Sequence, residues 1–422
     1  MTGTILAQII TIIAAPILTR IYSPSDYGVL AFYSSIISIL AVISCGRYEI
    51  AIVIPDNDEE AGSLFILSLL IGLLIVLIIF IIILFVNKWI PIWLPSKNIS
   101  TWIWLVPINL VIMSLFQALS YWNIRVKEYN RLAKRKVNQS IATALMQILL
   151  SVFKLGERGL IVGALIGQSV ATGLLMWQTS RTHIKDFRKK ISRKKIYSVA
   201  RKFRKFPLYD SWPSLLDNLT VAMPIIFFTY FYGSSVSGQL ALTLNILAIP
   251  SALIGASVSQ VYFQRLATSQ NEGMNPSTVV EPTFIGLLGI GVCFCLLVLL
   301  LAPPLFPIVF GSSWVIAGQY ARILAPAISL RFVVSPLSSV FAVLNRLELI
   351  AMWKVTSIVF TVGSLALSIK FNNPSTSLLF LMVNDLLIYS FYLTLIFKIS
   401  NSSILHSVKY AYVKLFTRNR SY

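Results

Sequence analysis

The chain has 422 residues, of which 57% are hydrophobic and only 12% are charged, and its formal net charge is +20. Soluble domains are about 45–50% apolar and about 25% charged, so this composition excludes an ordinary soluble fold. It favours a polytopic membrane protein, in which the positive charge either binds nucleic acid or sets the membrane topology.

Twelve apolar segments of the sequence are long enough to cross a membrane, which takes about 20 mostly apolar residues. The predicted fold class is an all-α polytopic membrane protein with about 12 transmembrane helices and little chain outside the bilayer. In chain order, the segments lie at roughly 1–19, 27–46, 61–86, 101–124, 139–154, 159–178, 207–231, 238–261, 283–306, 318–344, 349–370 and 375–397.

Two polar segments of the chain, 20–31 and 230–241, have similar sequences. Each lies between two long apolar stretches, so the match indicates two equivalent helix hairpins, one opening each half of the protein. Many transporters are duplicated bundles of this kind, with the binding site at the repeat interface. Aligned without a gap, the segments share Tyr22/Tyr232, Ser25/Ser235, Gly28/Gly238, Leu30/Leu240 and Ala31/Ala241.

The basic residues are distributed unevenly along the chain. With twelve spans and a cytoplasmic N-terminus, the inside loops and the C-terminal tail hold 26 of the 35 Lys and Arg residues, and the outside loops hold six. This asymmetry follows the positive-inside rule, so we predict that both termini are cytoplasmic. We divide the chain into an N-terminal six-helix lobe (1–180), a basic cytoplasmic linker (181–206), a C-terminal six-helix lobe (207–397) and a cytoplasmic tail (398–422).

The densest basic run, 181–205, lies in the linker between the two lobes. Within it, apolar residues recur near helical spacing, which predicts an amphipathic helix lying on anionic lipid headgroups. A nucleic-acid-binding arm is the alternative, but a basic run between two membrane spans favours headgroups, so we expect no nucleic-acid partner. The apolar residues are Ile191, Ile196, Val199 and Phe203.

The sequence contains no recognisable catalytic constellation. His183 and His406 lie in basic segments without a nearby cysteine, serine motif or carboxylate cluster. There is no glycine-rich phosphate loop, and the longest outside loop, 87–100, is too short for a catalytic domain. We therefore expect a protein that is not an enzyme and has neither a cofactor nor a metal site. The three cysteines are interpreted as buried small apolar residues: Cys45, Cys293 and Cys295.

Two carboxylates are predicted at similar membrane depths. Asp217 lies ten residues into the seventh span, about 15 Å deep, and Asp385 lies twelve residues from the end of the twelfth, about 18 Å deep. Each has an amide beside it, Asn218 and Asn384 respectively. A carboxylate pair in low dielectric shares a proton or binds a small cation, so these four residues are the candidate site for a transported Na⁺ or H⁺. The alternative is that each carboxylate is satisfied separately by a hydroxyl or backbone group.

Arg331 in the tenth span is predicted about 21 Å from the cytoplasmic side, close to the membrane midplane. Its guanidinium stays charged and needs an anion, either a helix carboxylate or a substrate phosphate or acidic sugar. Lys354, near the inner end of the eleventh span, has an alternative role, because its long side chain can snorkel to the lipid headgroups. A cavity with cations at its mouths and its middle suits a large anionic head group. The other cations assigned to substrate binding are Arg322 and Arg20 toward the outer end, and Arg47 and Lys354 toward the inner end.

Several segments of the chain form a recognisable set. In the first half they are TGTILAQII (2–10), PILTRIYSPSDYG (16–28) and RYEIAIVIP (47–55), followed by the acidic 56–61, and in the second half they are 232–238 and 250–265. Together these segments resemble bacterial Wzx-type polysaccharide-biosynthesis flippases of the multidrug/oligosaccharidyl-lipid/polysaccharide exporter (MOP) superfamily. Family members usually have a short segment before the first helix, and this chain begins directly in its first apolar stretch.

The resemblance implies two lobes around a central cavity and a location in the bacterial cytoplasmic membrane. It implies transfer of undecaprenyl-diphosphate-linked oligosaccharides, such as O-antigen, lipopolysaccharide or capsule repeat units, from the inner to the outer leaflet by alternating access. Related lipid II flippases couple transport to a cation through their C-terminal lobe. Asp217 and Asp385 lie on helices that correspond by order, so the resemblance makes them candidates for the same role. We expect a monomer, with association with glycan-polymerase machinery left open. A multidrug exporter of the same superfamily and a non-transporting scaffold for glycan assembly are the alternatives, and Arg331 argues against the exporter.

Overall fold

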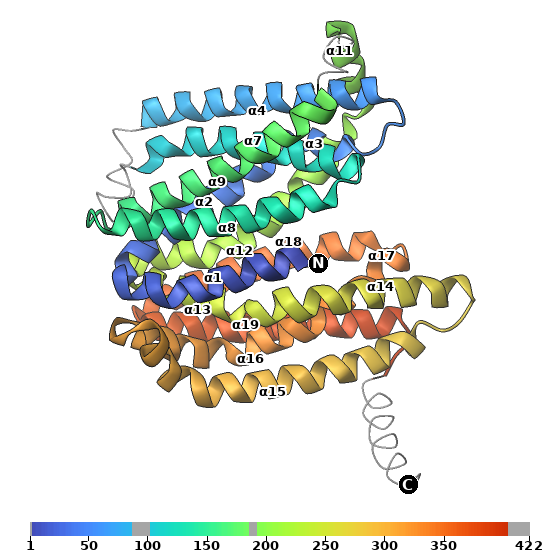
Figure 1. The fold of residues 1–422 in the computed structure, drawn as a ribbon. Helices are drawn as coiled ribbons and strands as arrows, with labels where there is room; N and C mark the ends of the chain where they lie inside the picture. Colours follow the sequence, from blue (N-terminus) through green and yellow to red (C-terminus); the bar gives the residue numbers. More distant parts are fainter. Residues whose placement is uncertain (1, 87–101, 185–191, 404–422) are drawn as a thin grey trace. The chain divides into compact units, whose positions relative to one another are not determined.

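The computed structural model describes residues 2–86, 102–184 and 192–403, and these residues form helices joined by short turns (Figure 1). The chain divides into two compact units, Met1–Ala241 and Leu242–Tyr422. The first unit contains α1 (Thr2–Ile21), α2 (Pro24–Ile43), α3 (Tyr48–Ala51), α4 (Asp58–Val86), α7 (Val106–Arg125), α8 (Tyr129–Ser151), α9 (Glu157–Thr179), α11 (Arg193–Lys202) and α12 (Ser211–Tyr232).

Helix α13 (Ser234–Leu247) crosses the boundary between the units. The division does not coincide with the lobe boundary expected at the linker, because α12 packs on α2 within the first unit. The second unit contains α14 (Ala256–Asn271), α15 (Ser277–Phe310), α16 (Val315–Leu337), α17 (Val340–Val343), α18 (Leu347–Ser368) and α19 (Pro374–Ile399).

Among the residues that the structure describes, eleven helical segments are long and apolar enough to span a membrane. They correspond to eleven of the twelve predicted spans. The remaining prediction, 139–154, lies in α8, which is a regular helix but has a basic N-terminal half, so its mean hydropathy is lower. Because α8 packs between α1 and α9, it is part of the same bundle (Figure 1). The predicted span 238–261 is not one regular helix, since a π-helical turn, η5 (Ser251–Gly255), separates α13 from α14.

The repeated segments meet at a close helix crossing within the first unit. The hydroxyls of Ser25 and Ser234 share a hydrogen bond of 2.7 Å. A Cβ atom added to Gly28 would overlap the backbone oxygen of Ser234, and one added to Gly238 would overlap that of Pro24. The two equivalent glycines therefore allow the first turns of α2 and α13 to touch backbone to backbone. The sequence repeat marks a pair of helix starts that pack on each other.

Local sequence explains why α2 begins where it does. Ser23 is the N-cap in extended conformation, and Pro24 follows at the first helical position. The Ser23 hydroxyl accepts from the Asp26 backbone N–H at 3.3 Å, while the Asp26 carboxylate accepts from the Ser23 backbone N–H at 2.9 Å. This reciprocal capping box satisfies two of the donors that a helix start leaves unpaired.

The linker helix α11 packs on the protein, which corrects the expectation that its apolar face lies on lipid headgroups. Val199 and Phe203 are buried in a cluster with Leu64 and Trp122, and Ile196 packs against it. Outside the cluster, Lys195 pairs with Glu59, and the Lys202 Nζ lies 2.7 Å from Glu60. Since exposed ion pairs add little stability, the apolar contacts hold α11 in place. Ile191 lies outside the described residues.

The cysteine prediction is partly wrong. Cys45 is buried as expected, but Cys293 is exposed and Cys295 is half-buried. Both lie on α15, the most apolar long helix of the second unit, and most of the surface of this helix is not covered by the rest of the protein. A small apolar side chain is equally compatible with that surface.

Candidate functional site

A polar cluster centred on Arg47 joins the turn after α2 to the start of α12. Arg47 Nε donates to Asp210 Oδ2 at 2.6 Å, and Nη2 lies 2.5 Å from the same oxygen. Nη2 also donates to the Ser214 hydroxyl at 3.0 Å. Asp210 ends the π-helical turn η4 (Phe206–Asp210), and Ser214 lies one turn further along α12. A planar guanidinium suits this forked arrangement, which a lysine would not reproduce.

Glu49 is a second carboxylate beside the same arginine, and only 1% of its side chain is exposed. Its Oε1 lies 3.9 Å from Arg47 Nη1, and its Oε2 has no hydrogen-bond partner among the described residues. Burial raises the Glu49 pKa from 4.5 to about 7, and the nearby Asp210 carboxylate also raises it. The backbone hydrogen bond and the Arg47 charge act in the opposite direction but do not cancel the desolvation.

Asp217 lies on the same side of α12 as the Arg47 partners. Ser214 and Asp217 are three residues apart, so their side chains leave the helix on neighbouring faces. Asp217 is exposed, and the neighbouring Asn218 donates its amide to the Ser214 backbone oxygen at 3.0 Å. The first unit thus has a polar stripe that begins at Asp210 and continues through Ser214 to Asp217.

In the second unit, α16 and α19 bring Arg331 near Asp385. The positive charge of Arg331 acts on the Asp385 carboxylate, and its guanidinium carbon lies 5.8 Å from the centre of the Tyr389 ring. Arg331 is exposed and forms no ion pair within the described residues. It therefore has a carboxylate nearby and a face that remains open to another anion.

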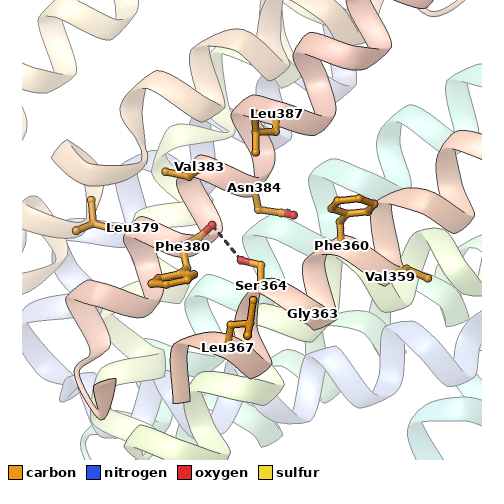
Figure 2. A pocket seen from close by; sticks show the side chains of 10 residues that line it. All are labelled: Val359, Phe360, Gly363, Ser364, Leu367, Leu379, Phe380, Val383, Asn384 and Leu387. Carbon is orange, nitrogen blue, oxygen red and sulfur yellow. Dashed lines mark hydrogen bonds between the residues drawn. The ribbon is translucent and has the colours of Figure 1, made fainter. Parts of the chain in front are cut away.

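Asn384 links this region to an apolar groove between α18 and α19. Its amide donates to the Thr361 hydroxyl at 3.2 Å and approaches the Asp385 carboxylate at 3.4 Å. The groove has a volume of about 540 Å³ and is shown in Figure 2. Asn384 and Ser364 are the polar side chains of its lining, and the Ser364 hydroxyl donates to the Phe380 backbone oxygen at 3.0 Å. This surface is suited to a hydrocarbon chain rather than to a sugar.

The other predicted cations are divided between the two units. Arg322 and Arg331 are nine residues apart on α16, which places them on opposite sides of a regular helix. Lys354 is half-buried on α18. Arg20 is exposed at the end of α1, in the first unit with Arg47. Asp217 and Asp385 lie in different units, so their pairing stays a prediction.

Sequence reasoning missed Asp210, Ser214 and the role of Glu49 in the Arg47 cluster. The charges themselves are visible in the sequence, since Arg47 and Glu49 flank Tyr48 and Asp210 lies near the start of the predicted span 207–231, but their pairing is not. It also missed Arg135, a guanidinium only 7% exposed that lies over the Phe116 ring at 3.3 Å. The count of 26 inside cations includes Arg135, but the structure places this residue in α8 and buries it.

The family described as polysaccharide biosynthesis protein matches residues 17–318 of the chain. No curated protein sequence matched.

Solved structures with the same fold cover almost the whole chain. The lipid II flippase MurJ, in an inward closed conformation, has a TM-score of 0.73 at 12% identity, with 98% of this chain and 90% of that chain covered. An inward-facing multidrug resistance MATE family transporter of the MOP superfamily has a TM-score of 0.72 at 15% identity, with coverages of 95% and 96%. A mutant of the Vibrio cholerae MATE transporter VcmN has a TM-score of 0.56 at 12% identity, with coverages of 96% and 95%. The chain therefore belongs to the polysaccharide biosynthesis protein family, and it has the fold of MOP-superfamily transporters.

Proposed function

We propose that the protein is a flippase that moves undecaprenyl-diphosphate-linked oligosaccharide units from the inner to the outer leaflet of the bacterial cytoplasmic membrane. The family match over residues 17–318 carries this proposal, on a fold shared with the lipid II flippase. Such a substrate has a diphosphate that binds cations and a chain that needs an apolar surface. In the second unit, Arg331 offers a cation and the α18–α19 groove offers an apolar surface.

The proposal is tested by reconstituting the purified protein into liposomes with a fluorescent polyprenyl-diphosphate oligosaccharide. A membrane-impermeant reductant then measures how much label reaches the outer leaflet. We expect labelled lipid to cross in the presence of the protein and to stay in place in protein-free vesicles. Failure of the lipid to cross, in vesicles whose protein is folded and inserted, would contradict the proposal.

A multidrug exporter is the second candidate, because the MATE transporter has a TM-score of 0.72 with this chain. Exporters of cationic drugs would favour carboxylates in the cavity, whereas Arg331 presents a positive charge. The two functions are separated by adding a fluorescent organic cation to the same liposomes. Movement of the cation without movement of the lipid would support the exporter.

We further propose that Asp217 and Asp385, with Asn218 and Asn384, form a site for a driving Na⁺ or H⁺. A ligand shifts two access states only by its differential affinity for them, and a carboxylate pair that closes in one state supplies that difference. Asp217→Asn and Asp385→Asn should each uncouple transport from the ion gradient, and the double variant should be little worse than either one. The liposome assay with imposed sodium or pH gradients measures this. Additive losses, or unchanged gradient dependence, would make the carboxylates separate structural features.

The proposed orientation puts both termini in the cytoplasm, as the distribution of basic residues predicts. In a protein with Cys45, Cys293 and Cys295 replaced, a single cysteine is introduced in place of Lys194, which is predicted to be cytoplasmic, or of Lys154, which is predicted to be outside. An impermeant maleimide applied to intact cells should label position 154 and should label position 194 only after the membrane is opened. Labelling of position 194 in intact cells would overturn the proposed topology.

A further inference from the structure

We propose that Glu49 is a proton-binding site and that its protonation controls a latch between the turn after α2 and the start of α12. The latch consists of Arg47 and its partners Asp210 and Ser214. This inference concerns a different place from the proposed coupling carboxylates, and it holds whatever substrate the protein moves.

Glu49 has the surroundings of a carboxyl group that carries a proton. It is 1% exposed, and its Oε2 has no hydrogen-bond partner among the residues that the structure describes. A buried, ionised and unpaired carboxylate is costly, and the usual outcome is that the group takes up a proton. The raised Glu49 pKa of about 7 agrees with this geometry and places the change within the physiological pH range.

Arg47 is the only guanidinium that the structure describes within ion-pair distance of Glu49, and Asp210 already occupies it. Two carboxylates thus compete for one cation. When Glu49 is neutral, Arg47 is fully available to Asp210 and Ser214. When Glu49 loses its proton, it becomes a second anion 3.9 Å from the Arg47 Nη1 and draws the guanidinium away from Asp210. Protonation therefore closes the latch, and a rise in pH loosens it.

The other titratable groups around Glu49 do not take over this role. Tyr121 on α7 interacts electrostatically with Arg47, Glu49 and Asp210. Cys45 precedes the cluster, and the Tyr48 hydroxyl donates to the Ala200 backbone oxygen at 3.0 Å. The acidic start of α4 has its own cations. Its side-chain pairs are Asp58 with Arg125, Glu59 with Lys195 and Glu60 with Lys202. The α4 residues in the buried cluster with Tyr48 carry no charge; they are Ala61, Leu64, Phe65 and Leu67.

The backbone on both sides of the latch departs from regular α-helix. Gly46 and Arg47 both have positive φ, 60° and 62°. For a non-glycine residue this left-handed conformation is uncommon and is kept by surrounding contacts, here the Arg47 ion pair. On the other side, η4 is a π-helical turn, a form often found at functional sites. Loss of the ion pair therefore frees the turn at Gly46–Arg47 and the π-helical turn η4 to move. Deprotonation of Glu49 thus changes the backbone on both sides of the latch.

Infrared spectroscopy of the purified protein tests the proton site directly. The wild type should show a protonated-carboxyl band that disappears as the pH rises through about 7, and Glu49→Gln should lack it. Asp210→Asn should shift the loss to lower pH, because the like charge is removed and Arg47 is freed for Glu49. The exposed Asp58→Asn serves as the control and should keep the wild-type band. A wild-type spectrum without such a band, or an identical band in Glu49→Gln, would overturn the proposal.

The latch is tested by the distance between spin labels at Val53 and Leu208, which are exposed on either side of it. In the wild type, the distance should be short and narrowly distributed at about pH 5.5, and longer or broader at about pH 8.5. Glu49→Gln should keep the short distance at both. A pH-independent distance in the wild type would show that the Arg47–Asp210 ion pair does not respond to the protonation of Glu49, which would overturn the latch. Failure here leaves the flippase proposal untouched, since no substrate is present.

Thermal unfolding gives an independent readout with a definite sign. The folded-state pKa of Glu49 lies above its unfolded value of 4.5, so the folded protein retains this proton to higher pH than the unfolded chain. The resulting stabilisation is full below pH 4.5 and is lost as the pH rises to about 7. Wild type should therefore melt earlier relative to Glu49→Gln as the pH rises through this window. A constant difference between the two proteins would contradict the assignment.

Discussion

Replacing Arg331 with alanine is expected to abolish export of the lipid-linked glycan, while Arg331→Lys should retain part of it. A hydrogen bond to a charged group contributes about 1.5–3 kcal/mol, so loss of one such contact in the transport step slows it about 10- to 100-fold. Loss of a forked contact to a diphosphate should exceed this. Lysine restores the charge but not the planar fork, which is why its rescue should be incomplete. Surface glycan in cells that depend on this protein measures the effect.

Arg346→Ala is the matched control, because it removes the same charge from an exposed residue that pairs with Glu348. It should leave export within about two-fold of wild type, as expected for an exposed pair. Both variants must be present in the membrane at wild-type abundance. Normal export by the Arg331→Ala protein would leave Arg331 as a structural residue.

The nearby carboxylate provides a further test of why Arg331 matters. If Arg331 mainly balances Asp385, then Arg331→Ala leaves a half-buried negative charge without its cation, and adding Asp385→Asn should restore function. If Arg331 binds the substrate, the second change should give no rescue. A double-mutant cycle on glycan export separates the two interpretations of a midplane arginine. We expect no rescue, since Arg331 is exposed and forms no ion pair in the described part of the chain.

Long apolar segments made the helices predictable from sequence, because a membrane requires helical backbone over their whole length. The predictions were weaker where polar residues enter a helix. In α8, the basic half lowers the hydropathy, yet the helix packs against α1 and α9 and buries Arg135. Helix α13 ends at Leu247, three residues before Pro250, which lacks the N–H needed to continue a helix, and the π-helical turn η5 begins directly after this proline.

The candidate sites were less predictable than the helices, since they depend on which helix faces meet. Membrane depth alone placed Asp217 level with Asp385, and because the two residues lie in different units, their pairing stays a prediction. The ion pair of Arg47 joins residues 163 positions apart, so local sequence could not reveal it. The apolar face of α11 was recognised correctly, but periodicity does not distinguish a lipid surface from the protein surface that covers it.

The crossing of the two repeated segments combines a signal visible in the sequence with a contact visible only in the structure. Gly28 and Gly238 occupy equivalent positions in the repeat, and each faces a backbone carbonyl oxygen of the other helix start. Overlap with backbone is harder to relieve than overlap with a flexible side chain, because the helices themselves must separate. Separation would also break the hydrogen bond between Ser25 and Ser234.

Gly238→Ala should therefore be among the most destabilising single-methyl changes in the first unit. Overpacking of a tight contact costs about 1–3 kcal/mol and occasionally more, and we expect the upper end here because the obstacle is the Pro24 carbonyl. Gly173→Ala, on α9 of the same unit, is the matched control. It has open space around the added methyl group, so the substitution should be neutral or stabilising by about 0.5–1 kcal/mol. Gly28→Ala should resemble Gly238→Ala, and combining them should cost less than the sum, since both changes separate the same crossing. The fraction of monodisperse protein remaining after heating in detergent measures all four variants. Equal melting of Gly238→Ala and Gly173→Ala would show that the crossing is loose enough to accept a side chain.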